Sequence, residues 1–200
     1  MKTTVYLVRH AEVKNPNHII YGRLPGFNLS HAGVAQAQKL HNWFMMKNIS
    51  AIYTSPLLRC HRTAKIISGE KIPIHISQKI IEIDTKWEGL SPADREECEV
   101  KEYIKNPTKI NLGESAFEVL DRMKSAVEKI AIQNMGKDVV LISHHGCIVY
   151  LRLFYEGMSL DFLNQAPCAN ASITSLILND ALECEGIGYS EIVSHRKDNP

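Results

Sequence analysis

Short apolar runs alternate along the chain with longer segments in which apolar residues recur at helical spacing. Runs with the length and composition of buried strands occupy 5–8, 51–54, 138–143 and 171–178, and a further strand is predicted at 190–195. The segments with helical spacing or helix-start signals are 30–44, 55–67, 91–106, 113–134 and 144–157. The stretch 15–28 contains Asn-Pro, Tyr-Gly and Pro-Gly pairs and is predicted to be a loop. Strands that alternate with helices in this way predict an α/β layer fold with a largely parallel sheet.

Serine residues mark several of the predicted helix starts. Ser30 can cap the first helix, and Ser55 followed by Pro56 has the pattern of a cap with proline in the first helical position. Ser115 and Glu118 have the spacing of a capping box. The positions expected to face the core are Val34, Ala37, Leu40 and Phe44 in the first helix, and Phe117, Leu120, Met123, Val127 and Ile130 in the helix after Ser115.

The composition narrows the classes of partner. Of 200 residues, 44% are hydrophobic and 22% are charged, and no repeat or linker divides them, so a single domain over 1–200 is predicted. The net charge of +1 gives no field that would attract nucleic acid or a membrane surface. The first apolar run is too short for a signal peptide and no stretch is apolar enough to span a membrane, so a cytoplasmic location is expected.

Polar side chains with related chemistry follow three of the predicted strands. They are Arg9 and His10 after 5–8, Ser55 directly after 51–54 with Arg59 one helical turn further on, and His144 with His145 after 138–143. In open α/β sheets the ligand lies beyond the carboxyl ends of the strands, so these side chains are expected to share one crevice. Two arginines and two histidines in one crevice would form a compact cationic pocket.

The chemistry of this set favours phosphoryl transfer. The rigid fork of an arginine matches the paired oxygens of a phosphate, and a neutral imidazole is a competent nucleophile near neutral pH. Either His10 or His144 could be that nucleophile. A metal site is not expected, because the adjacent residues His144 and His145 should point in opposite directions and the chain has neither a His-Glu-x-x-His motif nor a cysteine cluster.

Five ordered motifs within residues 3–156 then resemble one family. They are LVRHAE, LSHAGVAQAQKL, IYTSPLLRCHRTA, GESAFEVLDRM and LISHHG, and their order and spacing are similar to those of the histidine phosphatase superfamily, the phosphoglycerate mutase-like branch 1. The resemblance implies a three-layer sandwich in which helices flank a mostly parallel central sheet. It also implies that His10 becomes a phosphohistidine and that Arg9, Arg59 and His144 hold the phosphate.

The resemblance also suggests the proton donor and the outer contacts of the site. The segment IIEIDTKWEGL offers Glu82 as the general acid, with Glu88 as the competing candidate. The backbone N–H of His145 would face the phosphate, and Asn15 resembles the family's asparagine after the first motif. Apart from the resemblance, Arg23 belongs to the first loop and could either widen the positive mouth of the pocket or be a solvated loop charge. Two aromatic residues could form a wall for the organic part of a substrate or could simply pack in the structure: Trp87 and Tyr103.

The chain departs from the family pattern around the site. Ala11 replaces the usual glycine after the first histidine, which requires a backbone without positive φ at that position. The segment between Glu82 and Glu88 is one residue shorter than usual, and His145 replaces the usual glycine after the second histidine. None of these changes removes a catalytic residue that the resemblance assigns.

The sequence therefore predicts a phosphomonoester hydrolase that needs neither cofactor nor metal and acts on a small phosphorylated substrate. One alternative is transfer of the phosphoryl group to another hydroxyl, as in a cofactor-dependent phosphoglycerate mutase. Only 31 positions separate Glu82 from Gly113, where the mutases suggested by the resemblance have a longer insertion, and this favours hydrolysis. The other alternative is a non-catalytic module of the same fold that binds a phosphorylated ligand.

Overall fold

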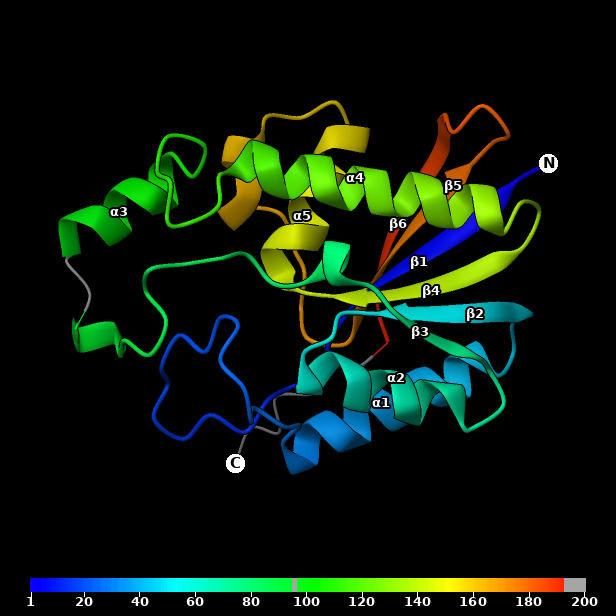
Figure 1. Ribbon diagram of the computed structural model, residues 1–200, viewed down its shortest axis with the longest axis horizontal. Helices are drawn as coiled ribbons and strands as arrows, with labels where there is room; N and C mark the ends of the chain where they lie inside the picture. Colours follow the sequence, from blue (N-terminus) through cyan, green and yellow to red (C-terminus); the bar gives the residue numbers. More distant parts are fainter. Residues whose placement is uncertain (95–96, 193–200) are drawn as a thin grey trace.

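In the computed structural model, which describes residues 1–94 and 97–192, a six-stranded sheet lies between two layers of helices (Figure 1). The order of the strands across the sheet is β3-β2-β4-β1-β5-β6. Their bounds are Thr3–Arg9 for β1, Ile49–Thr54 for β2, Ile74–Ile76 for β3, Asp138–Ser143 for β4, Ser172–Leu178 for β5 and Cys184–Glu191 for β6. Strands β3, β2, β4 and β1 are parallel, and β5 is antiparallel to both of its neighbours. The predicted three-layer sandwich with a mostly parallel sheet is confirmed.

Two pairs of helices cover the two faces of the sheet. Helices α1, His31–Phe44, and α2, Leu58–Ser68, pack on one face, and α4, Ala116–Gln133, and α5, His145–Tyr155, pack on the other (Figure 1). Helix α3, Glu97–Lys105, lies beyond the carboxyl ends of the central strands. Short 3₁₀ helices occupy Gln78–Ile80, Pro92–Asp94 and Leu160–Asn164. No helix in the described part of the chain is long and apolar enough to cross a membrane.

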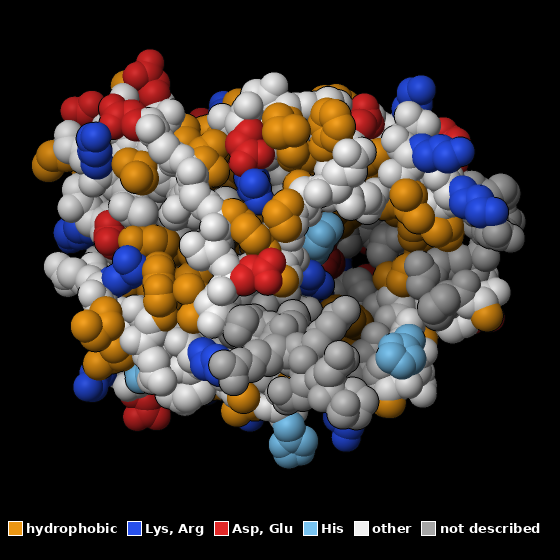
Figure 2. Space-filling model, turned by 180° about the vertical axis from the view of Figure 1, so that it is seen from behind, with side chains coloured by type: hydrophobic (Ala, Val, Ile, Leu, Met, Phe, Trp, Pro, Cys, Tyr) orange, Lys and Arg blue, Asp and Glu red, His pale blue; other side chains and the backbone are white. Residues whose placement is uncertain are grey.

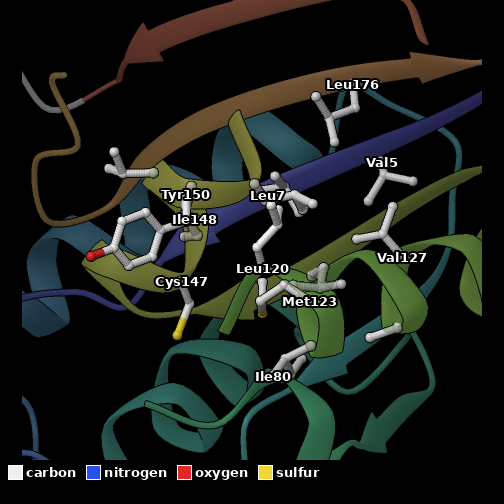
Figure 3. Packing of buried hydrophobic residues seen from close by; sticks show 14 of the residues in the cluster. Val5, Leu7, Ile80, Leu120, Met123, Val127, Cys147, Ile148, Tyr150 and Leu176 are labelled. Carbon is white, nitrogen blue, oxygen red and sulfur yellow. The ribbon is translucent and has the colours of Figure 1, made fainter. Parts of the chain in front are cut away.

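The central strands are buried on both faces, and their side chains alternate between the two layers of helices. Val5 and Leu7 of β1 belong to the cluster under α4 and α5, whereas Tyr6 and Val8 belong to the cluster under α1 and α2. Figure 3 shows Val5 and Leu7 packed with side chains of α4 and α5. This double burial explains why the strands are continuous apolar runs in the sequence.

Two of the side chains predicted to face the core are exposed. Val34 in α1 is 47% exposed and Phe117 in α4 is 58% exposed. The buried stripe of α4 includes Ala116 and Val119, so Phe117 lies to one side of it although Leu120, three residues further on, is buried. The capping box of Ser115 and the remaining core positions of both helices are confirmed.

Two element boundaries predicted from the sequence are wrong. Helix α2 begins at Leu58, with Leu57 as a cap that makes no side-chain hydrogen bond, so Ser55 does not cap it. The last strand is β6, at Cys184–Glu191, where pairing with β5 overrides a weak apolar pattern that contains two glycines. Of the predicted strand at 190–195, residues 193–195 lie outside the described part of the chain. The predicted helix at 91–106 is represented by the 3₁₀ turn at Pro92–Asp94 and α3.

The contrast between Met123 and Phe117 on one helix predicts two different losses of stability. Met123 is fully buried, so Met123→Ala should lower the free energy of unfolding by about 2–5 kcal/mol. Phe117→Ala should change it by only about 0.5 kcal/mol, because most of the ring already meets solvent. Urea unfolding of both variants measures the difference, and equal losses would show that Phe117 faces the core.

Candidate active site

The carboxyl ends of three neighbouring parallel strands meet at one edge of the sheet. The register between β1 and β4 places Arg9 beside Ser143, and the backbone N–H of His10 donates to the carbonyl of Ser143 at 3.0 Å. The N–H of Ser55, just after β2, donates to the carbonyl of Ile142 at 3.0 Å. Continued pairing beyond the strands therefore brings His10, Ser55 and His144 together.

His10 is held as a neutral imidazole with one defined tautomer. Its side chain is 1% exposed, and its Nδ1 lies 2.9 Å from the carbonyl oxygen of Ala11. A carbonyl can only accept, so Nδ1 carries the proton and Nε2 keeps its lone pair. Burial, and after it the positive charge of Arg59, lowers the pKa of His10 well below its usual value. Ala11 does not adopt positive φ, so the backbone accepts the alanine found there.

Arg59 is a buried guanidinium that contacts several groups of the site. Its Nη2 donates to the carbonyl of Gly22 at 2.7 Å and lies 3.2 Å from Nδ1 of His144 and 3.7 Å from a carboxylate oxygen of Glu82. The guanidinium carbon is also 4.7 Å from the centre of the Tyr21 ring. These contacts hold the guanidinium in one orientation.

Arg9 and Arg59 each keep a donor without a protein acceptor. Nη1 of Arg9 donates to the carbonyl of Cys168 at 2.7 Å, which holds the side chain in place. The Nε atoms of both arginines are buried and have no hydrogen-bond partner among the described residues. Buried donors normally have partners, so two such groups in one crevice indicate a place for an anion.

His144 is fully buried and joins Arg59 to Ser55. Its Nε2 lies 2.8 Å from the hydroxyl of Ser55, and its Nδ1 lies 3.2 Å from Nη2 of Arg59, which can only donate. Nδ1 is therefore the acceptor, and Nε2–H donates to Ser55. Burial, and then the charge of Arg59, lowers the pKa of His144 well below its usual value. The proton on His144 is thus fixed by the two neighbours.

Of the two candidate acids, Glu82 stands in the site and Glu88 does not. A carboxylate oxygen of Glu82 lies 3.4 Å from Nδ1 of His144, and the side chain is 18% exposed. Burial raises the pKa of Glu82, although the charge of Arg59 opposes the shift. Glu88 instead accepts a hydrogen bond from the backbone N–H of Arg23. The geometry therefore favours Glu82 as the proton donor.

Arg122 holds the segment of chain that carries Glu82. Arg122 of α4 donates to the carbonyls of Lys79 at 2.9 Å and Ile81 at 2.7 Å. The same guanidinium contacts the Glu114 carboxylate through Nε at 2.5 Å and Nη2 at 2.9 Å. The segment that ends at Glu82 is thereby clamped to α4.

Arg23 belongs to the same clamp and does not line the mouth of the pocket. Its Nε donates to the backbone carbonyl of Glu82 at 2.8 Å, its Nη2 to Glu114 at 3.1 Å, and its Nη1 lies 3.6 Å from Asp84. The predicted substrate contact of Arg23 is therefore replaced by a positioning contact, because carboxylates distant in sequence take up the guanidinium.

The other two predicted binding residues have different places. The side-chain amide of Asn15 donates to the carbonyl of Ile19 at 2.8 Å and holds the 15–28 loop instead of lining the cavity. His145 does line the cavity and is the first residue of α5, whose cap, His144, makes no side-chain hydrogen bond to the helix. The free N–H groups at a helix start favour an anion. Burial, and then the charge of Arg9, lowers the pKa of His145 to about 4.

Four of the predicted site residues line a cavity of about 360 Å³. Arg9, His10, Glu82 and His145 line it together with residues of the 15–28 loop and of the 83–112 segment. Figure 2 shows a hollow in this face of the molecule, where basic, acidic and histidine side chains meet. A concave site with convergent polar groups has the form of a small-molecule site.

Comparisons with known proteins agree with this arrangement. The model of the histidine phosphatase superfamily (branch 1) matches residues 5–183. The chain is 36% identical to an uncharacterized protein of Mycobacterium tuberculosis, over 88% of this chain and 90% of that one. It is 30% identical to phosphoserine phosphatase 1 of Hydrogenobacter thermophilus, over 87% of this chain and 86% of that one.

Solved structures show the same fold. Bacillus stearothermophilus YhfR superposes with a TM-score of 0.85 at 26% identity, over 92% of this chain and 94% of that one. A phosphoserine phosphatase mutant of Entamoeba histolytica, solved in complex with phosphoserine, has a TM-score of 0.79 at 23% identity, over 92% and 96% of the two chains. The chain belongs to the histidine phosphatase superfamily, branch 1.

Sequence reasoning missed several residues that shape the site. Ser55 was noted directly after a strand but was given only the role of a helix cap, whereas it contacts His144 in the site. Arg122 had no such signal, because it is one polar residue on an amphipathic helix and acts on backbone carbonyls about forty positions away. Tyr21 lay in a segment recognised only as loop.

The clamp predicts a selective effect of Arg122→Met. If Arg122 positions Glu82, the variant should lose on the order of tenfold to a hundredfold in kcat/KM on an alkyl phosphate, which needs a proton on its leaving oxygen. An aryl phosphate, with a good leaving group, should lose much less. Lys124→Met, on the same helix and in an exposed pair with Glu128, is the matched control. Equal losses on the two esters would mean that Arg122 has only a structural role.

Proposed function

We propose that the chain is a phosphomonoester hydrolase that works through a phosphohistidine at His10. The observation that carries this proposal is the fixed tautomer of His10, with a neutral Nε2 in a crevice where two arginines keep unused donors. A neutral nucleophile beside fixed cations is the arrangement that attack on a phosphate needs. Relatives named phosphoserine phosphatase support phosphatase chemistry.

In the first step, Nε2 of His10 attacks phosphorus in line with the leaving oxygen. A P–N bond forms as the P–O bond to the leaving alcohol breaks, and negative charge is shared by the three other oxygens. Arg9, Arg59 and the N–H groups at the start of α5 would hold these oxygens. Their donors are fixed by the fold, so little reorganisation is needed during the reaction.

Glu82 would give its proton to the departing oxygen and later take one from water. Nδ1 of His144 accepts a hydrogen bond from Arg59 and therefore carries a lone pair and no proton. A charged carboxylate of Glu82 beside that lone pair would be repelled, so the protonated carboxyl is favoured there. Burial also raises the pKa of Glu82, which likewise favours the protonated carboxyl. In the second step the Glu82 carboxylate accepts a proton from water as the water oxygen attacks phosphorus. The P–N bond then breaks, and His10 and protonated Glu82 are restored.

The assignment of Glu82 predicts a dependence on the leaving group and on pH. Glu82→Gln should lower kcat/KM on an alkyl phosphate by about a hundredfold or more and on an aryl phosphate by much less. With the alkyl ester, the wild-type rate should fall as pH rises through the raised pKa of Glu82, because the acid form is lost. Steady-state pH profiles of both proteins test this, and the alkaline fall should be absent in the variant.

His10→Ala is the baseline for this experiment and should hydrolyse neither ester. Glu88→Gln is the matched control, since Glu88 caps the backbone at Arg23 and stands outside the site. An equal loss on both esters in Glu82→Gln, or a larger selective loss in Glu88→Gln, would reject Glu82 as the acid. Turnover by His10→Ala at the wild-type rate would reject the phosphohistidine route.

A further inference from the structure

We infer that the site prefers phosphate monoesters whose leaving group is uncharged and apolar, such as an aryl-alkyl alcohol, over short charged esters such as phosphoserine. This inference rests on the proposed function and specifies its substrate class. It comes from the distribution of charge and apolar surface along the cavity.

The lining of the cavity combines a few charged or imidazole groups with a larger number of apolar and aromatic side chains. The charged and imidazole groups of the lining are Arg9, His10, Glu82 and His145, which the proposed function assigns to the phosphate. The rest of the lining comes from the 15–28 loop and the 83–112 segment, and besides Tyr21, Gly22 and Thr85 it consists of Ile19, Ile20, Ile83, Trp87, Tyr103 and Leu112. An organic group that enters the cavity behind a bound phosphate therefore meets mostly hydrocarbon and aromatic carbon. Burial of an apolar group on such a lining is favourable, and burial of an unpaired charge is costly.

Two of the three aromatic side chains in the lining, those of Trp87 and Tyr103, direct their polar atoms to protein partners. The indole N–H of Trp87 donates to Glu99 at 3.1 Å, and the hydroxyl of Tyr103 shares a hydrogen bond with Tyr150. The two rings pack edge to face, with centroids 5.5 Å apart. Neither Glu99 nor Tyr150 lines the cavity, so the two rings are left to present carbon to a ligand.

Two basic side chains in the described parts of the nearby loops are held by carboxylates of the protein. Arg23 is taken up by Glu114 and Asp84, and Lys86 pairs with Glu99. Neither of the two basic residues lines the cavity. His145 does, but its pKa of about 4 keeps it uncharged at neutral pH. Among the described residues of the lining, the one full cation is Arg9, which the proposed function assigns to the phosphate.

A substrate ammonium group would also lack a free carboxylate partner among the described lining residues. Glu82 is the one carboxyl group among the described lining residues, and the proposed mechanism needs it protonated for the leaving oxygen. Asp84 and Glu114 are held by arginines outside the lining. A phosphoserine molecule would therefore lose water from two charged groups without gaining partners, whereas a phenyl ring would find a ready surface.

The test compares esters with leaving alcohols of similar reactivity, so that binding and not chemistry sets the difference. The wild-type protein should have a kcat/KM for 2-phenylethyl phosphate at least about tenfold above those for ethyl phosphate and phosphoserine. Ile19→Lys places a cation in the lining and should reduce this preference by about tenfold or more, with phosphoserine gaining relative to 2-phenylethyl phosphate. Ile132→Lys, at an exposed position of α4, is the matched control and should leave the preference unchanged.

The outcomes separate this inference from the proposed function. If phosphoserine is hydrolysed as efficiently as 2-phenylethyl phosphate, and His10→Ala hydrolyses neither, the hydrolase stands and the apolar substrate class is overturned. The inference is also overturned if Ile19→Lys lowers all three esters by the same factor. If no ester in the panel shows turnover that depends on His10, the proposed function fails and the inference fails with it.

Discussion

Arg59 carries a positive charge at a position where only 1% of the residue meets solvent, and much of the active site is organised around that charge. A buried cation is costly unless polar groups surround it. Here the carbonyl of Gly22, the imidazole of His144 and the carboxyl of Glu82 provide contacts, and the ring of Tyr21 covers the guanidinium. The same charge helps to keep His10 and His144 neutral. One buried arginine therefore contacts several polar groups of the candidate site and, together with burial, favours the neutral form of both histidines.

The sheet makes this arrangement possible because three adjacent parallel strands end together. Strand β4 pairs with both β1 and β2, and the register of these pairings sets where His10, Ser55 and His144 lie relative to one another. The proposed acid, Glu82, lies instead on an irregular segment that follows the 3₁₀ helix Gln78–Ile80. Because no strand holds it, Arg122 and Arg23 bind its carbonyls and Glu114 joins the two arginines. Rigid strands position the groups proposed to bind phosphate, and side-chain clamps position the proposed acid.

The sequence predicted the part of the site that strands carry and missed the part that long-range contacts carry. Apolar runs followed at once by Arg9, His10 or His144 are local patterns, so their convergence could be anticipated from the topology of a parallel sheet. Glu82 came from family resemblance, since nothing local separates it from Glu88. Arg23 could not be placed correctly, because its partner Glu114 lies 91 positions away. Ser55 was misread for a related reason: its cap pattern is local, whereas its partner His144 lies 89 positions away.

The central claim is that His10 becomes covalently phosphorylated during turnover. The most direct measurement is rapid mixing of the protein with a ³²P-labelled phosphate ester, quenching in alkali, and mapping of the labelled peptide. The account predicts label that is stable in alkali and lost in acid, on the peptide that contains His10, with none in His10→Ala. Hydrolysis at the wild-type rate with no labelled protein, or label on the peptide that contains His144, would contradict it.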